Sequence, residues 1–159
     1  MSYQAVILTV SDSCAAGTRT DTSGPAIRAM LENAGFAVQA MQTVPDEEGQ
    51  ISAAIVHACD ILQADLVVTT GGTGLSPCDV TPEATLAVLD REIRAIPVAM
   101  WVEGLKSTPR AMLSRAVAGI RGHTLVLNVP GSEKAARENL SAVVATLDHA
   151  LRMLAGGGH

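Results

Sequence analysis

Aromatic residues are nearly absent from this 159-residue chain, which has one Trp, one Tyr and one Phe. Proteins that read nucleic acids by stacking on the bases need exposed aromatic side chains. The net charge is −5, and no cluster of Lys or Arg is long enough to follow a phosphate backbone. Both features argue against a nucleic-acid partner. Any phosphate site must therefore be local, made of backbone amides and a few cations.

Cysteines and long apolar runs are also scarce. Cys14, Cys59 and Cys78 lie far apart without C-x-x-C spacing, and an odd number argues against a disulfide framework. No apolar run approaches the ~18–20 residues of a membrane span, and no charged-then-apolar leader opens the chain. We therefore expect a cytoplasmic protein with no membrane partner. The four histidines (His57, His123, His149 and His159) show no metal-ligand spacing.

Small and branched apolar residues are what the chain has in quantity. Hydrophobic residues make up 48% and charged residues 17% of the sequence, as in an ordinary folded protein. The length suits one domain. We expect this domain to cover residues 1–155, with a flexible tail over 156–159.

Apolar runs and helical patterns alternate along the chain. Strands are predicted at Gln4–Val10, 36–44, Leu66–Thr70 and Thr124–Val129. Helices are predicted from Ser23-Gly24-Pro25 to Ala34, over 45–62, over about 82–90, over 108–118 and over 132–154, and the pattern leaves 93–98 unassigned. This order predicts an α/β fold, a three-layer α/β/α sandwich around a mainly parallel sheet.

Ligands of such sheets bind beyond the carboxyl ends of the strands. Four predicted loops follow strands, at 11–12, 45–46, 71–79 and 130–132. We therefore expect these loops to converge at one edge of the sheet.

The most informative of them is TTGGTGLSPCDVTPEAT at 69–85. Gly71, Gly72 and Gly74 let the backbone approach a ligand closely and direct amides at phosphate oxygens. The stretch is neither G-x-G-x-x-G nor a P-loop. Thr81-Pro82 begins a helix, whose positive end favours an anion. Alternatively, the glycines only permit a turn and Asp79 only caps a helix, but the complete string exceeds what a turn needs.

GGTGLSPCDVTPEAT closely resembles the signature of the MogA/MoaB family, which includes the G domain of gephyrin. The resemblance continues in LTVSDS, in DTSGP at 21–25, in VPDE at 44–47, in LKSTPRAMLSRAVAGIRG at 105–122 and in TLVLNVPGS at 124–132. It implies a molybdopterin adenylyltransferase that transfers AMP from ATP to the terminal phosphate of molybdopterin and releases pyrophosphate. It also implies a homo-oligomer, a trimer or hexamer. Whether a molybdate-inserting enzyme docks on the chain stays open.

Two aspartates that are critical in the family match Asp46 and Asp79. Adenylyl transfer needs the polyphosphate charge neutralised and the attacking phosphate held in line, and Mg²⁺ is held by one or two carboxylates with phosphate oxygens and water. We therefore assign Asp79 and Asp46 as catalytic carboxylates and magnesium ligands, with Mg²⁺ as cofactor and ATP as co-substrate. Which of the two contacts the metal stays open. Asp46 also fits an ordinary helix start stabilised by the dipole.

Substrate contacts are predicted for further residues. Ser11 and Asp12 border the nucleotide, although a turn explains them equally well. Gly131 and Ser132 start a helix whose free amides suit a phosphate, and Ser132 is also an ordinary N-cap. In similar proteins Ser107, Ser114 and Arg115 are on the molybdopterin side, whereas Lys106 and Arg110 fit a solvated helix start. The complete predicted substrate-binding set is Ser11, Asp12, Gly71, Gly72, Thr73, Gly74, Thr81, Glu83, Ser107, Ser114, Arg115, Gly131 and Ser132.

Cys78 departs from the family pattern, because many relatives carry a basic residue there. Losing that cation beside the phosphates would weaken ATP binding unless another residue, such as Arg115, supplies it. Cys78 also fits a small, tolerated substitution. Together with the short length of the chain, it leaves open an alternative function, a MoaB-type protein that binds molybdopterin or nucleotide without efficient transfer. A scaffold like the gephyrin domain would need linkers or a fused domain, and the sequence has neither.

Overall fold

A single mixed sheet organises residues 2–157, the part of the chain that the computed structural model describes. Its order is β2-β1-β3-β6-β5-β4. The strands are β1 (Gln4–Val10), β2 (Ala37–Val44), β3 (Leu66–Thr70), β4 (Arg91–Glu92), β5 (Ala118–Arg121) and β6 (Thr124–Val129). β2, β1, β3 and β6 run parallel, whereas β5 and β4 are antiparallel at one edge. The predicted mainly parallel sheet is confirmed.

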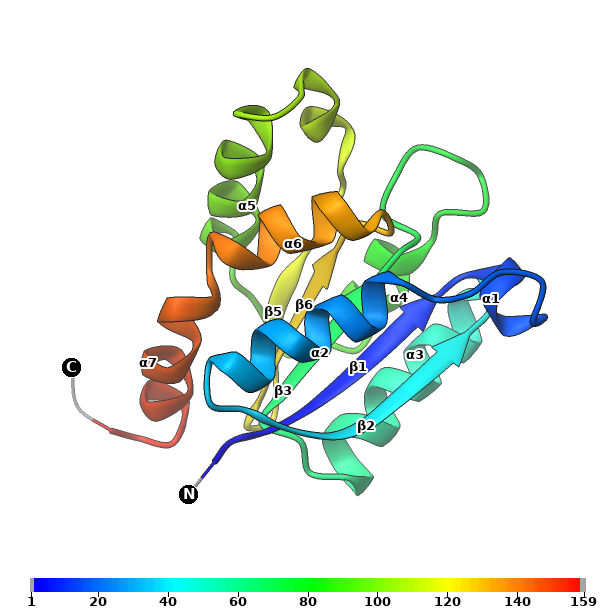
Figure 1. The fold of residues 1–159 in the computed structure, drawn as a ribbon. Helices are drawn as coiled ribbons and strands as arrows, with labels where there is room; N and C mark the ends of the chain where they lie inside the picture. Colours follow the sequence, from blue (N-terminus) through cyan, green and yellow to red (C-terminus); the bar gives the residue numbers. More distant parts are fainter. Residues whose placement is uncertain (1, 158–159) are drawn as a thin grey trace.

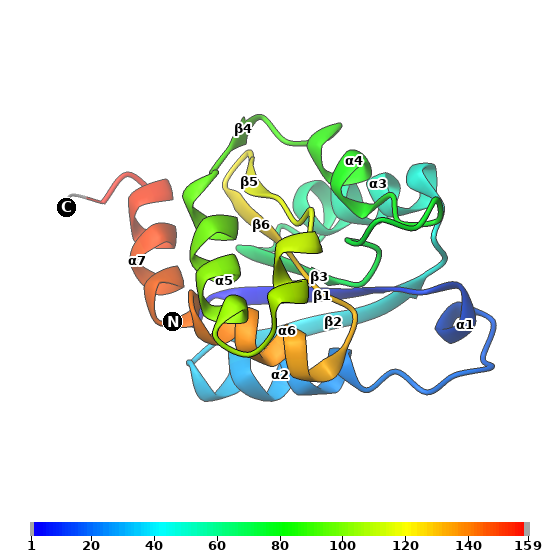
Figure 2. The ribbon, with the colours of Figure 1, turned by 90° about the horizontal axis from the view of Figure 1, so that it is seen from above.

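Helices cover both faces of this sheet (Figures 1 and 2). One face carries α2 (Ser23–Asn33), α5 (Ala95–Leu105), α6 (Glu133–Ser141) and α7 (Val144–Leu154), and the other carries α3 (Glu48–Val56) and α4 (Thr81–Leu86). A short α1 (Asp12–Ala15) follows β1. The predicted α/β/α sandwich is therefore correct.

Successive side chains along each buried strand point to opposite faces of the sheet, so the core has two layers. On β1, Ala5 and Ile7 face the layer of α2 and α6, while Val6 and Leu8 face the layer of α3. A strand buried on both faces is mostly apolar, which explains the apolar run of β1. All five residues of β3 are buried as well, and its two polar residues are hydrogen-bonded: Thr69 Oγ1 accepts from Asn128 Nδ2 at 2.8 Å, and Thr70 Oγ1 donates to the Pro130 carbonyl at 2.7 Å.

The predictions over 82–118 differ from the structure, because this part of the chain forms the antiparallel edge of the sheet. α4 ends at Leu86, β4 follows, and α5 begins within the unassigned region and continues to Leu105. The predicted helix over 108–118 is wrong: a 3-10 helix, η2 (Pro109–Leu113), leads into β5. Tertiary hydrogen bonds explain the change, because the Val117 N–H donates to Asn128 Oδ1 at 3.1 Å and the Asn128 N–H donates to the Val117 carbonyl at 3.0 Å.

Two other predicted helices are interrupted. The helix over 45–62 becomes α3 followed by a π-helical turn, η1 (His57–Ile61). The helix over 132–154 divides into α6 and α7 at Val143, whose φ is −123°. This break redirects the chain so that Val143, Leu147 and Leu151 all remain in the core.

Gly156 and Gly157, the first two residues of the predicted tail, are hydrogen-bonded to α7. The N–H of Gly156 donates to the Met153 carbonyl at 3.0 Å, and that of Gly157 donates to the Arg152 carbonyl at 2.9 Å, so both cap α7. The remaining tail residues, 158–159, lie outside the described residues. None of the helices within residues 2–157 combines the length and apolar character of a membrane span.

Candidate functional site

The four loops that follow the parallel strands meet at the carboxyl edge of the sheet, as predicted. In Figure 1 this is the end towards which the arrowheads of β1 and β2 point. The Ser11 N–H donates to the Val44 carbonyl at 2.9 Å, which joins the ends of β1 and β2. The Gly71 N–H donates to the Val129 carbonyl at 3.1 Å, which joins the ends of β3 and β6.

Two adjoining cavities open at this edge. The larger has a volume of about 700 Å³ and lies between the glycine-rich loop, η2 and the start of α6. Of the predicted site residues it is lined by Gly72, Thr73, Gly74, Asp79, Ser107, Ser114, Gly131 and Ser132. The smaller, about 380 Å³, is lined by Ser11, Asp46, Gly71, Gly72, Asp79, Gly131 and Ser132 among the predicted residues.

The wall between the cavities is made of residues that line both. These are Gly72, Asp79, Gly131 and Ser132. Asp79 is the one carboxylate among them, so a group bound in either cavity meets the same negative charge. Two ligands that occupied both cavities at once would each be next to Asp79.

Asp46 is fixed in the smaller cavity through a reciprocal contact with Asp12. The Asp46 N–H donates to Asp12 Oδ1 at 2.8 Å, and the Asp12 N–H donates to Asp46 Oδ2 at 3.1 Å. Partial burial raises the pKa of Asp46; the hydrogen bond from the Asp12 backbone opposes this, and the charges of Asp12 and Asp79 raise it further. Asp46 and Asp79 therefore share one cleft and interact electrostatically.

The glycine-rich loop requires its first two glycines. Gly71 and Gly72 have φ values of +103° and +69°. A Cβ atom on Gly71 would overlap the Val10 carbonyl oxygen, and one on Gly72 would overlap Thr81 Oγ1 and lie 3.2 Å from Asp46 Oδ1. The backbone thus passes directly over β1, Thr81 and Asp46.

Asp79 closes the loop on itself. Its N–H donates to the Ser76 carbonyl at 2.8 Å, and its Oδ2 accepts from the Ser76 N–H at 3.1 Å. Thr81, which begins α4, is completely buried, and its Oγ1 lacks a hydrogen-bond partner among the described residues. Thr81 thus supports the loop from behind and is not on either cavity wall.

Ser132 and Ser11 each cap the start of a helix. Ser132 Oγ accepts from the Ala135 N–H at 3.2 Å and Ser11 Oγ accepts from the Cys14 N–H at 3.2 Å, so both are N-caps. Both also line the smaller cavity. Capping and ligand contact are therefore compatible.

Arg115 and Glu83 lie elsewhere. Neither is among the residues that line the cavities. The Arg115 guanidinium instead contacts the Glu83 carboxylate at 2.6 Å and two carbonyl oxygens of the glycine-rich loop. Their predicted contact with substrate stays a prediction.

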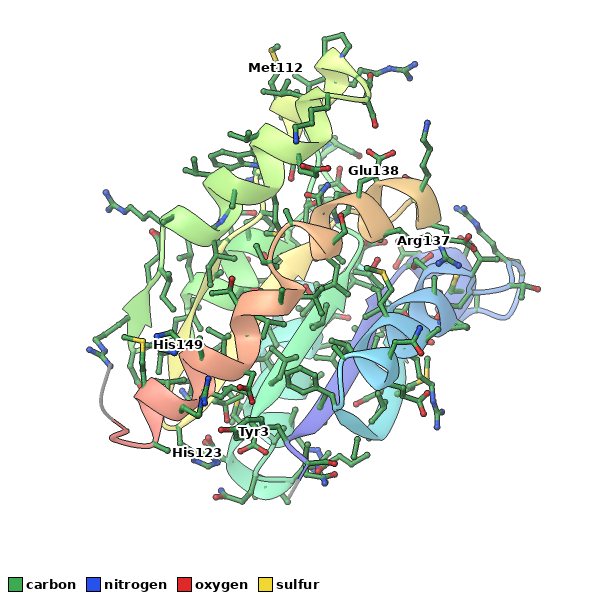
Figure 3. The ribbon with its side chains drawn as sticks, turned by 60° about the vertical axis from the view of Figure 1, so that its left-hand side comes forward. Tyr3, Met112, His123, Arg137, Glu138 and His149 are labelled. Carbon is green, nitrogen blue, oxygen red and sulfur yellow. The ribbon has the colours of Figure 1, made fainter. Side chains whose placement is uncertain are left out.

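No histidine among residues 2–157 lines either cavity. His123 and His149 lie at the opposite end of the molecule from Glu138, which lines the larger cavity (Figure 3). Within residues 2–157, no group of three or more His, Cys, Asp or Glu side chains is arranged to hold a metal ion. Three carboxylates, those of Asp21, Asp46 and Asp79, line the smaller cavity.

Comparisons with known proteins agree with this geometry. Residues 6–149 match the family model described as "Probable molybdopterin binding domain". The solved structure of the molybdopterin biosynthesis enzyme MoaB from Thermus thermophilus is similar, with a TM-score of 0.92, 49% identity and 97% of each chain covered. The chain belongs to the MogA/MoaB family.

Named relatives in this family differ in length. The chain is 37% identical to a molybdopterin adenylyltransferase of Helicobacter pylori, with 94% of this chain and 86% of that protein covered. It is 40% identical to the Drosophila melanogaster molybdenum cofactor synthesis protein cinnamon, with 93% of this chain covered. The chain spans only 25% of the cinnamon protein.

Three basic side chains that were not predicted from the sequence line the cavities. Arg19 lines the smaller cavity, and Arg110 and Lys134 line the larger one. Arg19 and Lys134 belong to none of the family motifs, and Arg110 was interpreted as part of a solvated helix start. The family motif DTSGP was the available signal for the neighbouring wall: Asp21 Oδ2 accepts from Thr9 Oγ1 at 2.7 Å, and Asp21 lines the smaller cavity.

The three cysteines are expected to differ in reactivity. Cys78 is exposed, Cys14 is partly exposed and Cys59 is buried. Burial raises the pKa of Cys59 to about 11, so at pH 8 only roughly one Cys59 in a thousand is a thiolate. Iodoacetamide followed by peptide mass spectrometry should label Cys78 first and Cys59 only after unfolding. Equal labelling rates in the folded protein would contradict this burial.

Proposed function

We propose that the chain is a molybdopterin adenylyltransferase that transfers AMP from Mg-ATP to molybdopterin and releases pyrophosphate. The observation that supports this most is the pair of adjoining cavities with Asp79 in their common wall. A transfer between two substrates needs both to be bound at once with their reacting ends together. A protein that only binds one ligand has no such requirement.

We assign molybdopterin to the larger cavity and ATP to the smaller one. The larger cavity includes Ser107 and Ser114, which the family resemblance associates with the pterin, and the cations Arg110 and Lys134, which suit its terminal phosphate. The smaller cavity includes Ser11, Arg19 and Asp46. Both volumes fall within the range of about 300–1,000 Å³ that is usual for small-molecule sites.

The residues present fit a magnesium ion in the smaller cavity. Asp46 and Asp79 both line it, and the charges of Asp12 and Asp79 raise the pKa of Asp46 after the larger effect of burial. This concentration of negative charge suits a hydrated divalent cation, which one or two carboxylates and phosphate oxygens hold. When bound, Mg²⁺ supplies positive charge that offsets the polyphosphate.

The chain itself binds and aligns the reactants. The amide of Gly72 in the loop and those of Gly131 and Ser132 at the α6 start suit phosphate oxygens, whereas the Gly71 N–H is already bonded to the Val129 carbonyl. A terminal phosphate oxygen of molybdopterin attacks the α-phosphorus of ATP. The bond from that phosphorus to the bridging oxygen breaks, and pyrophosphate leaves with the electron pair.

The direct test is incubation of the protein with molybdopterin, ATP and Mg²⁺, followed by separation of adenylylated pterin and measurement of pyrophosphate. The proposal predicts both products in equal amounts and neither without the protein. Bound molybdopterin without product, from protein shown to be folded, would instead favour the alternative, a MoaB-type binding protein. That alternative keeps support from Cys78, which stands where many relatives carry a basic residue.

We further propose that the protein assembles as a trimer or hexamer. α5 exposes a stripe of apolar side chains at helical spacing, Val98, Val102 and Leu105, with exposed fractions of 48%, 57% and 45%. Met112 on η2 adds to it, and Figure 3 shows Met112 at the outer end of the molecule. Exposed apolar clusters of this kind are typical of contacts between protein chains, and a second copy of this chain is the partner that the resemblance implies.

Replacing Val102 with aspartate is expected to dissociate this oligomer. A charge buried in an apolar contact is strongly unfavourable, so sedimentation at micromolar concentration should change from trimer or hexamer to monomer. Ile61→Asp is the matched control, because Ile61 is 69% exposed and lies outside the stripe. A monomeric wild-type protein under these conditions would contradict the assembly.

A further inference from the structure

Arg115 makes an unusual set of contacts for a residue expected to bind substrate. Its Nε donates to the Gly74 carbonyl at 2.8 Å, and its Nη2 donates to the Asp79 carbonyl at 2.7 Å. Its Nη1 donates to Glu83 Oε2 at 2.6 Å, and its backbone N–H donates to the Thr73 carbonyl at 2.8 Å. One residue therefore binds the glycine-rich loop at both ends.

The loop between these attachments has few other restraints. Leu75, Ser76, Pro77 and Cys78 are all exposed. The hydrogen bonds of Ser76, Cys78 and Asp79 within this turn run to one another. Such a turn keeps its own shape but does not fix its position on the protein body.

Glu83 completes the contact from the first turn of α4. It accepts from Arg115 Nη1 and also from Nη2, at 3.3 Å. The hydrogen bond from Arg115 lowers the pKa of Glu83, so this carboxylate is charged at neutral pH. Charge-assisted, two-point contacts between Arg and carboxylate are among the stronger and more directional hydrogen bonds.

We propose that Arg115 and Glu83 are positioning residues, a clasp that fixes the glycine-rich loop and thereby sets the place of Asp79 between the two cavities. The guanidinium nitrogens all donate to protein oxygens, and neither residue lines a cavity. Arg115 therefore acts through the loop and not on the pterin phosphate. The catalytic part of this inference rests on the proposed adenylyl transfer, whereas the clasp itself does not.

The test compares Arg115→Met with Arg121→Met. Arg121 is a matched control because it also bonds a carboxylate, Asp60 at 2.7 Å, and a carbonyl, Val88 at 2.9 Å. It does not contact the glycine-rich loop or line either cavity. The readouts are kcat and KM for adenylyl transfer, and hydrogen exchange of the amides between residues 73 and 80.

We expect Arg115→Met to lower kcat about 100-fold with KM for molybdopterin nearly unchanged, because small misplacements of a catalytic group have effects of this order. Exchange over 73–80 should become about tenfold faster, as the loss of charge-assisted hydrogen bonds implies. Arg121→Met should leave kcat and the exchange rates over 73–80 within about threefold of the wild-type values. Glu83→Gln should lower kcat and speed up exchange in the same way as Arg115→Met, but by smaller factors. It also tests the clasp if Arg115→Met does not fold.

A higher KM for molybdopterin with unchanged kcat in Arg115→Met would overturn the inference in favour of direct substrate contact. Unchanged exchange over 73–80 in both clasp variants would overturn it as well. If the wild type is inactive, adenylyl transfer fails as the proposed function. The exchange data then still decide the clasp, since faster exchange in Arg115→Met but not in Arg121→Met supports it and equal exchange contradicts it.

Discussion

Replacing Asp79 with asparagine is expected to lower kcat for adenylyl transfer about 100- to 1,000-fold, the usual effect of losing one electrostatic contact to the transition state. Asp79 is the carboxylate that lines both cavities. Asparagine keeps an oxygen that can accept from the Ser76 N–H, so the loop keeps its shape while the charge is lost. Asp79→Ala should abolish turnover and leave the fold intact. Steady-state formation of adenylylated pterin gives the measurement.

The control for Asp79→Asn is Asp148→Asn. Asp148 pairs with Arg152 on the surface of α7 at 3.2 Å, with its side chain 60% exposed. Its loss should leave kcat unchanged, because exposed ion pairs contribute little. Should Asp79→Asn retain activity within threefold of wild type, Asp79 would have no part in the reaction.

Gly71→Ala is expected to cause the largest loss of stability of any single change at the site. Gly71 has a φ of +103°, and an added Cβ would overlap the Val10 carbonyl oxygen of β1. Unfavourable backbone geometry and overpacking together predict a decrease of about 2–5 kcal/mol in the free energy of unfolding. The midpoint of urea unfolding, followed by circular dichroism, measures it.

Gly49→Ala is the companion variant. Gly49 lies in the first turn of α3, and a Cβ there would meet nothing within 4 Å. Alanine favours a helix over glycine by about 0.5–1 kcal/mol, so this variant should be as stable as the wild type or slightly more stable. A Gly71→Ala protein that unfolds at the wild-type midpoint would mean that the loop can move away from β1.

The buried parallel strands and the convergence of their loops could be predicted from the sequence. β1, β3 and β6 consist mostly of apolar residues because they are covered on both faces, and that pattern is visible without a structure. Once the strands are parallel, Ser11, Asp46, Gly71 and Ser132 must lie at one edge. Their shared cavity followed from topology.

The antiparallel edge could not be predicted in the same way. β4 has two residues and β5 four, too few for a period to emerge. LKSTPRAMLSR has a helix-start signal at Thr108-Pro109, and the structure begins a helix there, with Thr108 Oγ1 accepting from the Arg110 N–H at 3.3 Å. Long-range hydrogen bonds from Arg115 to Thr73 and from Val117 to Asn128 then end it. Local pattern carries no information about those partners.

Some charged residues of the site could be predicted from the sequence, and others could not. Asp46 and Asp79 were identified through family motifs, but their common cleft depends on the loop path past Gly72. Arg115 stood in a family motif as well, yet its contacts with Gly74, Asp79 and Glu83 span at least 32 residues of sequence. Lys134 and Arg19 had no motif of their own. Their presence on the cavity walls follows only from the folded chain.

Simultaneous binding of the two ligands tests the two-cavity arrangement most directly. Molybdopterin is titrated calorimetrically into the protein alone and into protein saturated with Mg²⁺ and an ATP analogue that has a methylene group between the α- and β-phosphorus. We predict one equivalent of pterin per chain in both titrations, with an affinity that the analogue does not weaken. Displacement of the analogue by molybdopterin would contradict the account, because the ligands would then compete for one cavity.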